Sequence, residues 1–147
     1  MTLSCEDELR RFVRARGIED RVKFTGYVRN VHEYLQAADL FVFPTEGEAF
    51  PLSLVEAMSC GLPVIASRVG GIPEIVTHGR DGILVDPANP EALAREIAFL
   101  MKETPTAGSL GSNARRTVCE AYSIESVASQ YFESLCGICA VRGGPRT

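Results

Sequence analysis

The sequence predicts an α/β fold in which helices flank a Rossmann-like parallel sheet. Two observations carry this prediction: short, continuously apolar runs alternate with segments of helical periodicity, and proline, glycine or aspartate separates them. Continuous apolar runs are typical of strands buried on both faces, and strands that alternate with helices favour parallel connections. The length of 147 residues fits a single domain.

The first predicted elements are a helix, a strand and a second helix. Residues 6–16 are amphipathic with the spacing of a helix, and Gly17 ends the pattern. Residues 22–25 are expected to form a short strand. Asn30 is the candidate N-cap of a helix that continues to Ala38.

The middle of the chain supplies the apolar runs of the predicted sheet. Residues 40–43 and 63–66 are expected to be buried strands, and a helix over residues 51–60 connects them. A short helix with proline in its first turn follows at residues 72–76. Residues 83–85 form the last predicted strand.

The remainder of the chain is predicted to be helical. One helix covers residues 90–102, a second covers residues 112–122, and a third starts at the turn from Ser123 to Ser126. Residues 141–147 contain two glycines and a proline and are expected to be a disordered tail.

Composition excludes several classes of function. The net charge of −4 argues against nucleic acid as a partner, because that partner requires a clustered positive surface. No apolar run approaches the roughly 20 residues of a membrane span. The odd number of cysteines, without a repeated spacing, indicates reduced thiols and a cytoplasmic location.

The segment from Thr45 to Met58 carries the candidate chemistry, since it leaves a buried strand and enters a helix. Ligands of open α/β sheets bind beyond the carboxyl ends of the strands, and a helix N-terminus there suits a phosphate. Glu48 and Glu56 could accept hydrogen bonds from neutral hydroxyls of a sugar or ribose. On spacing alone, the simpler interpretation is favoured, in which both glutamates complement the helix dipole and face water.

The chain resembles the glycosyl transferases group 1 family, which are retaining enzymes of the GT-B fold also called glycosyltransferase family 4. Glu48 and Glu56 match the E-x7-E motif of that family. Further blocks follow in the family's order: Val22-Lys23-Phe24-Thr25-Gly26-Tyr27-Val28, Phe41-Val42-Phe43-Pro44, Cys60-Gly61-Leu62-Pro63-Val64-Ile65-Ala66, Gly70-Gly71-Ile72-Pro73-Glu74-Ile75 and Asp81-Gly82-Ile83-Leu84-Val85.

The resemblance implies that residues 1–140 are part of the C-terminal, nucleotide-sugar-binding domain of a retaining, hexosyltransferase-type enzyme. Glu48 would hold a donor-sugar hydroxyl at the reaction centre as the catalytic residue, and Glu56 would bind the ribose. The donor and its nucleobase would also contact residues of the two adjoining loops: Gly47, Ala49, Phe50, Pro51, Leu52, Gly26, Tyr27 and Val28. The substrate would be a nucleoside-diphosphate sugar, with neither metal nor cofactor, because amides, the helix dipole and basic side chains stabilise the leaving diphosphate.

The chain departs from the family pattern in two places. The family often has Gly-Phe-Gly where this chain has Ala49-Phe50-Pro51, and Pro51 removes one amide donor. The first two strands of the domain, a phosphate-gripping basic pair and the acceptor-binding N-terminal domain have no counterpart in this chain. We therefore expect a fragment or a subunit that is inactive alone and can dimerise through an exposed sheet edge. The alternative is a non-catalytic nucleotide-binding or interaction module.

The role of Gly70 and Gly71 is left open by the sequence. These glycines could let the backbone approach a ligand closely. They could equally serve only the turn from the strand into the short helix.

Overall fold

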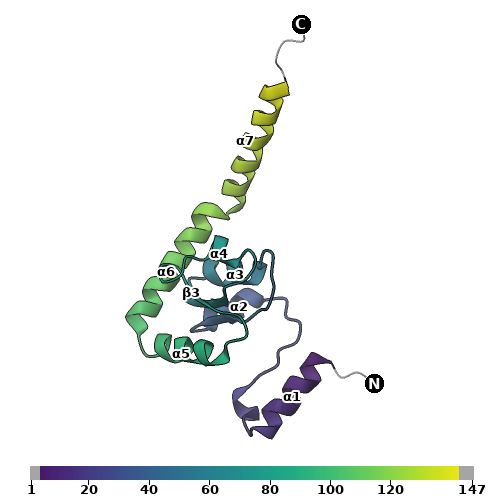
Figure 1. Ribbon diagram of the computed structural model, residues 1–147, viewed down its shortest axis with the longest axis vertical. Coiled ribbons are helices and arrows are strands. Elements are labelled where there is room, and N and C mark those ends of the chain that lie inside the picture. Colours follow the sequence, from purple (N-terminus) through teal and green to yellow (C-terminus); the bar gives the residue numbers. More distant parts are fainter. Residues whose placement is uncertain (1–3, 143–147) are drawn as a thin grey trace. The chain divides into compact units, whose positions relative to one another are not determined.

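The computed structural model describes residues 4–142 and divides the chain into two compact units, Met1–Val31 and His32–Thr147. The two units are described separately (Figure 1). In the first, α1 (Cys5–Ala15) begins with a capping box, in which the Ser4 hydroxyl accepts a hydrogen bond from the Asp7 amide at 3.2 Å. A single 3₁₀ turn, η1 (Glu19–Arg21), follows the helix.

The strand predicted over residues 22–25 is wrong, because this segment pairs with no strand in the described part of the chain. Its backbone is extended at Val22, with φ −121° and ψ 118°. Phe24 instead packs against α1, where the Arg10 guanidinium carbon lies 4.3 Å from its ring centroid. An apolar, extended segment becomes a strand only when a neighbour supplies its hydrogen bonds, and the sequence pattern does not report that neighbour.

The second unit contains a parallel sheet of three strands in the order β1-β2-β3. The strands are β1 (Phe41–Phe43), β2 (Val64–Ser67) and β3 (Ile83–Val85). Phe41 pairs with Val64, and Ile65 pairs with Ile83. The parallel sheet with flanking helices confirms the predicted fold class.

Helices connect and cover these strands (Figure 1). Their bounds are α2 (Val31–Ala37), α3 (Leu52–Ser59), α4 (Ile72–Ile75), α5 (Pro90–Leu100), α6 (Thr104–Ala121) and α7 (Ile124–Arg142). Helix α6 begins at Thr104, earlier than the predicted start at Ser112. The added turns contain Gly108 and Gly111, which intrinsic propensity disfavours in a helix. Gly111 lies so close to the Gly61 carbonyl oxygen that no side chain fits between them.

The core lies on both faces of the sheet. On one face, Val64 and Ala66 pack with Leu54 and Met58 of α3. On the other face, Ile65 packs with residues of β3, α5 and α6. The alternation along β2 follows from the strand period of two, and it confirms that this strand is buried on both sides.

Strand β1 is only partly buried, although its apolar run predicted full burial. The reason is its position, since β1 pairs with β2 alone among the described residues and therefore forms one edge of the sheet. An edge strand has a neighbour on one side only, and less of its surface is covered.

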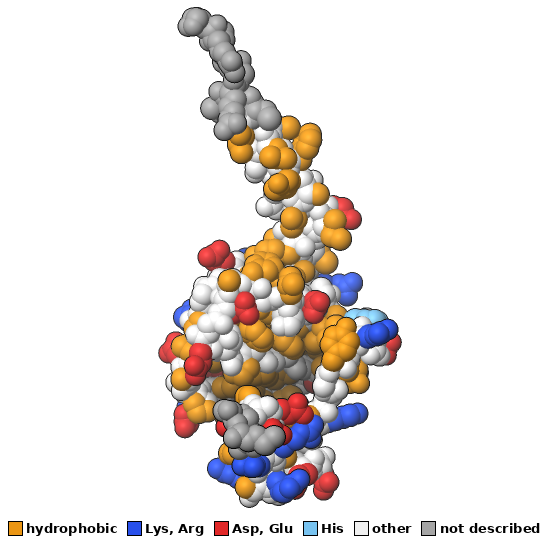
Figure 2. Space-filling model, turned by 90° about the vertical axis from the view of Figure 1, so that its right-hand side faces the viewer, with side chains coloured by type: hydrophobic (Ala, Val, Ile, Leu, Met, Phe, Trp, Pro, Cys, Tyr) orange, Lys and Arg blue, Asp and Glu red, His pale blue; other side chains and the backbone are white. Residues whose placement is uncertain are grey.

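Helix α7 leads away from the strands and carries a row of apolar side chains (Figure 2). Ile124, Tyr131 and Phe132 are 85%, 68% and 68% exposed. The helix continues to Arg142, and residues 143–147 of the expected tail lie outside the described residues. None of the described helices combines the length and apolarity needed to span a membrane.

Candidate functional site

The candidate site is the loop that leaves β1 at Pro44 and enters α3 after Pro51, here called the donor loop (residues 45–51). Pro51 is buried at the N-cap of α3, and its carbonyl oxygen accepts hydrogen bonds from the amides of Leu54 and Val55 at 3.1 and 3.2 Å. The first amides of a helix have no acceptor within the helix. Helix α3 therefore directs free donors and the positive end of its dipole toward the carboxyl end of β1.

Glu48 is half-buried in the donor loop, and its carboxylate folds back onto the loop backbone. One oxygen, Oε1, accepts hydrogen bonds from the amides of Ala49 at 2.9 Å and Phe50 at 3.2 Å. The family resemblance implies that the Phe50 amide donates a hydrogen bond to the sugar or the distal phosphate. In this structure the Phe50 amide donates its hydrogen bond to the Glu48 carboxylate instead.

Glu56 lies on α3 and is exposed. Glu48 and Glu56 lie on one continuous segment, the donor loop and the helix that follows it. The same segment contains the following expected site residues: Gly47, Ala49, Phe50, Pro51 and Leu52. The expected nucleobase contacts Gly26, Tyr27 and Val28 belong to the first unit. Within that unit Tyr27 is 90% exposed.

The donor loop is contacted by two further segments, the Gly70-Gly71 turn, whose role the sequence left open, and the end of α6, which the sequence did not assign to the site. The Gly71 amide donates a hydrogen bond to the Glu48 carbonyl oxygen at 3.1 Å. Tyr122, at the end of α6, packs its ring against Phe50 with 5.7 Å between the ring centroids. No local sequence signal could identify Tyr122, because 72 positions separate it from Phe50 (122 minus 50).

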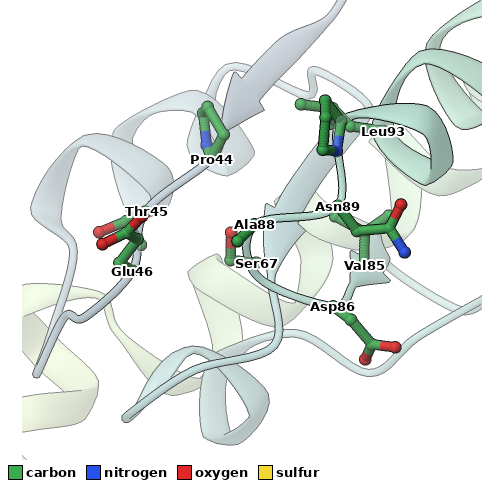
Figure 3. Close-up of a pocket in the computed structure, with 10 residues that line it drawn as sticks. Pro44, Thr45, Glu46, Ser67, Val85, Asp86, Ala88, Asn89 and Leu93 are labelled. Carbon is green, nitrogen blue, oxygen red and sulfur yellow. The ribbon is translucent and has the colours of Figure 1, made fainter.

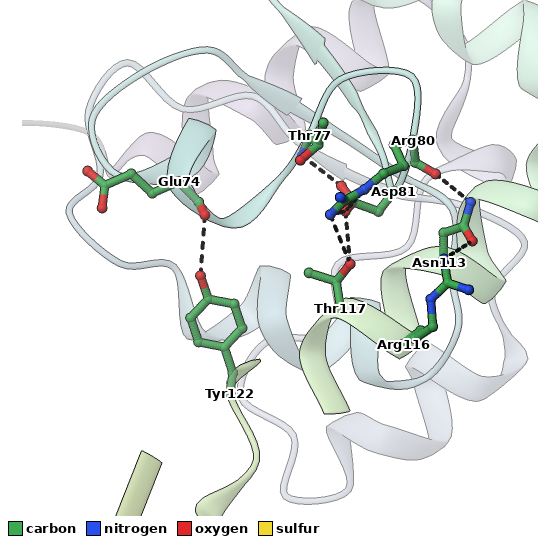
Figure 4. Close-up of polar contacts among 8 residues, drawn as sticks. All are labelled: Glu74, Thr77, Arg80, Asp81, Asn113, Arg116, Thr117 and Tyr122. Carbon is green, nitrogen blue, oxygen red and sulfur yellow. Dashed lines mark hydrogen bonds and ion pairs between the residues drawn. The ribbon is translucent and has the colours of Figure 1, made fainter. Parts of the chain in front are cut away.

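The Tyr122 hydroxyl donates a hydrogen bond to the Glu74 carbonyl oxygen at 3.4 Å (Figure 4). Burial raises the pKa of Tyr122 above its ordinary value, and the negative charges of Glu74 and Asp81 raise it further. The neutral phenol is therefore the form that this packing favours.

A cavity of about 160 Å³ opens at the carboxyl ends of the three strands (Figure 3). Its polar lining comes from residues that end a strand or follow one within four positions: Thr45, Glu46, Ser67, Asp86 and Asn89. Thr45 and Glu46 belong to the segment that the sequence assigned to the candidate chemistry, but Ser67, Asp86 and Asn89 were not expected in the site. The signal was available, because the carboxyl ends of parallel strands meet at one edge of a sheet. Glu48 and Glu56 do not line this cavity.

Asp81 holds the loop between α4 and β3 against α6 (Figure 4). It is fully buried, and its carboxylate accepts hydrogen bonds from the Thr77 amide at 2.7 Å, the Thr117 hydroxyl at 2.9 Å and the Arg80 guanidinium at 2.7 Å. Every carboxylate oxygen is thus engaged within the protein. The Asp81-Gly82 turn is therefore a structural element of the domain.

The parallel sheet, the helix that starts beyond β1 and the carboxylate between them define an α/β domain of the type that binds ligands at the carboxyl ends of its strands. Residues 4–117 match the family described as "Glycosyl transferases group 1". The chain belongs to this family.

The relatives agree with this assignment. The chain is 42% identical over 114 residues to N-acetyl-alpha-D-glucosaminyl L-malate synthase of Bacillus anthracis, covering 78% of this chain and 30% of that enzyme. Among solved structures, HepE of Anabaena in complex with UDP has a TM-score of 0.86 and 32% identity, with 90% of this chain and 36% of HepE covered.

The C-terminal domain of a group 1 glycosyl transferase, LpcC of Francisella tularensis, also matches. Its TM-score is 0.75 at 26% identity, and the match covers 81% of this chain and 63% of that domain. The fold is therefore that of the C-terminal domain of GT-B enzymes. The chain spans between 30% and 36% of the two longer relatives named above.

Proposed function

We propose that this chain supplies the donor site of a retaining glycosyltransferase. In that reaction the bond from the anomeric carbon to the diphosphate oxygen breaks, and the diphosphate leaves with the electron pair. A bond from the same carbon to an acceptor oxygen forms on the same face of the sugar, and the acceptor hydroxyl passes its proton to the departing diphosphate oxygen. Glu48 holds a hydroxyl of the donor sugar, and Glu56 holds the ribose.

The observation that carries this proposal is the placement of both glutamates on the loop and helix that follow β1. Carboxylates there can accept hydrogen bonds from neutral hydroxyls, while the start of α3 supplies donors and a positive dipole for the diphosphate. Preorganised donors of this kind stabilise the charge that develops on a leaving group. HepE, a relative of known structure, was solved in complex with UDP-glucose, which makes uridine nucleotides the first donors to test.

Isothermal titration calorimetry of the purified chain with UDP and with GDP tests the donor site. We expect one of the two nucleotides to bind. Glu56→Gln removes the charge from the acceptor of the ribose hydrogen bond, and binding should weaken by about 1–3 kcal/mol.

Glu120→Gln is the matched control, because Glu120 is also an exposed helical glutamate, on α6. This control should bind the nucleotide as the unmodified chain does. If the Glu56 variant binds the nucleotide equally well, Glu56 only complements the helix dipole and faces water.

The alternative is a non-catalytic nucleotide-binding or interaction module. One observation favours it: the cavity beyond the strands contains no basic side chain to offset the charge of a diphosphate. Sugar transfer in the presence of an acceptor-binding GT-B domain would exclude the alternative. Nucleotide binding without transfer in that reconstituted assay would support it.

A further inference from the structure

Two adjacent glycines follow β2 and lie against the backbone of the donor loop. A Cβ atom on Gly70 would lie 1.9 Å from the Glu48 carbonyl oxygen, and one on Gly71 would lie 2.1 Å from the Ala49 carbonyl oxygen. Real Cβ atoms essentially never come within 3.0 Å of such neighbours. Any side chain at either position therefore displaces the donor loop or the glycine segment.

Backbone conformation separates the roles of the two glycines. Gly70 has φ +51°, so the turn itself favours glycine there. Gly71 has φ −81° and ψ −3°, a conformation that any residue adopts. The turn alone gives no reason for glycine at position 71. The reason is the close approach to Ala49, together with the hydrogen bond from the Gly71 amide to the Glu48 carbonyl oxygen.

The same contact determines where the Glu48 carboxylate can reach. Its hydrogen bonds to the Ala49 and Phe50 amides make its position depend on the backbone of residues 48–50. The Gly71 amide holds the Glu48 end of that backbone through its hydrogen bond, and the buried Pro51 holds the end that enters α3. A shift of the loop by a few tenths of an ångström is therefore passed on to the carboxylate.

We propose that Gly71 is a positioning residue for Glu48: it holds the donor loop so that the carboxylate meets the donor sugar. This proposal rests on the proposed function, in which Glu48 binds the sugar and Glu56 binds the ribose. It answers the question that the sequence left open. The glycine serves neither a ligand contact nor the turn alone, but the packing of one loop on another.

The test compares UDP with UDP-glucose, because only the second ligand has a sugar for Glu48 to hold. Gly71→Ala should weaken UDP-glucose binding about tenfold to a hundredfold, the range for a lost hydrogen bond to a charged group. The same variant should weaken UDP binding less, because UDP has the diphosphate but no sugar for Glu48 to hold. Gly108→Ala is the matched control on α6, where a Cβ meets nothing within 4 Å, and it should change neither affinity.

A double-mutant cycle separates positioning from general damage to the fold. If Gly71 acts through Glu48, the losses of UDP-glucose affinity caused by Gly71→Ala and Glu48→Gln are not additive. Additive losses, or equal weakening of UDP and UDP-glucose by Gly71→Ala, would overturn the positioning role and leave the proposed function standing. An unmodified chain that binds neither ligand, nor GDP and GDP-mannose, would overturn the proposed function and this inference with it.

Amide hydrogen exchange provides a test that needs no variant, which matters if Gly71→Ala does not fold. UDP-glucose should slow exchange of the Gly71 amide in the unmodified chain more than UDP does. The Gly71 amide donates to the Glu48 carbonyl oxygen, and the bound sugar restricts the motion of Glu48. Equal protection by the two ligands would contradict the proposal.

Discussion

At the scale of single residues, two side chains contact the backbone or ring of the donor loop: the Glu48 carboxylate accepts hydrogen bonds from the Ala49 and Phe50 amides, and the Tyr122 ring packs against Phe50. Glu48 follows a buried strand and Glu56 lies on the next helix, and both placements follow from the order of apolar and helical segments. The hydrogen bonds of the Glu48 carboxylate to its own loop could not be predicted, because a rotamer depends on every atom that surrounds it. Tyr122 was missed for a related reason: its contact with Phe50 exists only after folding.

Tyr122 gives a prediction for the pH dependence of stability. Its pKa is raised in the folded chain by burial and by the charges of Glu74 and Asp81. A raised pKa of an acidic phenol means that the folded state favours the neutral form. The corresponding stability is fully present below the ordinary tyrosine pKa and is lost as the pH rises through the folded value.

We therefore expect Tyr122→Phe to lose less of its free energy of unfolding than the unmodified chain between neutral pH and about pH 11, a window above the ordinary tyrosine pKa of about 10. Urea unfolding at a series of pH values measures the difference. Tyr131→Phe is the control, since Tyr131 is 68% exposed and should behave as the unmodified chain does. Parallel alkaline losses in all three proteins would contradict the assignment.

At the scale of elements, the sequence pattern predicted the secondary structure that a segment favours, but not the tertiary contacts that allow or prevent it. The three strands of the sheet follow from continuous apolar runs. Residues 22–25 have a comparable pattern and do not form a strand, because no neighbouring strand pairs with them. Helix α6 shows the opposite case, in which tertiary packing makes use of glycines that intrinsic propensity disfavours.

Two glycines of α6 should respond to alanine with opposite signs. Gly108 has open space around its missing Cβ, so Gly108→Ala should raise the free energy of unfolding by about 0.5–1 kcal/mol through helix propensity. Gly111→Ala should lower it by about 1–3 kcal/mol, the usual cost of overpacking, because its Cβ would lie 2.1 Å from the Gly61 carbonyl oxygen. Denaturant unfolding of both variants at low protein concentration checks the pair, and a gain in stability for Gly111→Ala would show that α6 moves freely away from Gly61.

At the scale of the whole chain, two surfaces remain without a partner in the described structure. One is the free edge of β1, which pairs with β2 alone. The other is the apolar row on α7, made of the following residues: Ile124, Val127, Tyr131, Phe132, Leu135 and Ile138. Spacing along a helix shows which side chains share a face, but it does not show whether anything covers that face. Contiguous apolar surface of this kind marks a site of association.

We therefore expect the chain on its own to self-associate and to transfer no sugar. An open strand edge offers unpaired amides and carbonyls to another copy, and exposed apolar side chains add to the attraction. Sedimentation velocity over a range of concentrations measures the association. Tyr131→Glu with Leu135→Glu should abolish it if α7 is the contact and leave it unchanged if the β1 edge is. Transfer should fail because no basic side chain is among the described residues that line the cavity beyond the strands, and one lost electrostatic contact typically costs about 10²–10³ in rate. A monomeric chain that melts cooperatively and transfers glucose from UDP-glucose would contradict both expectations.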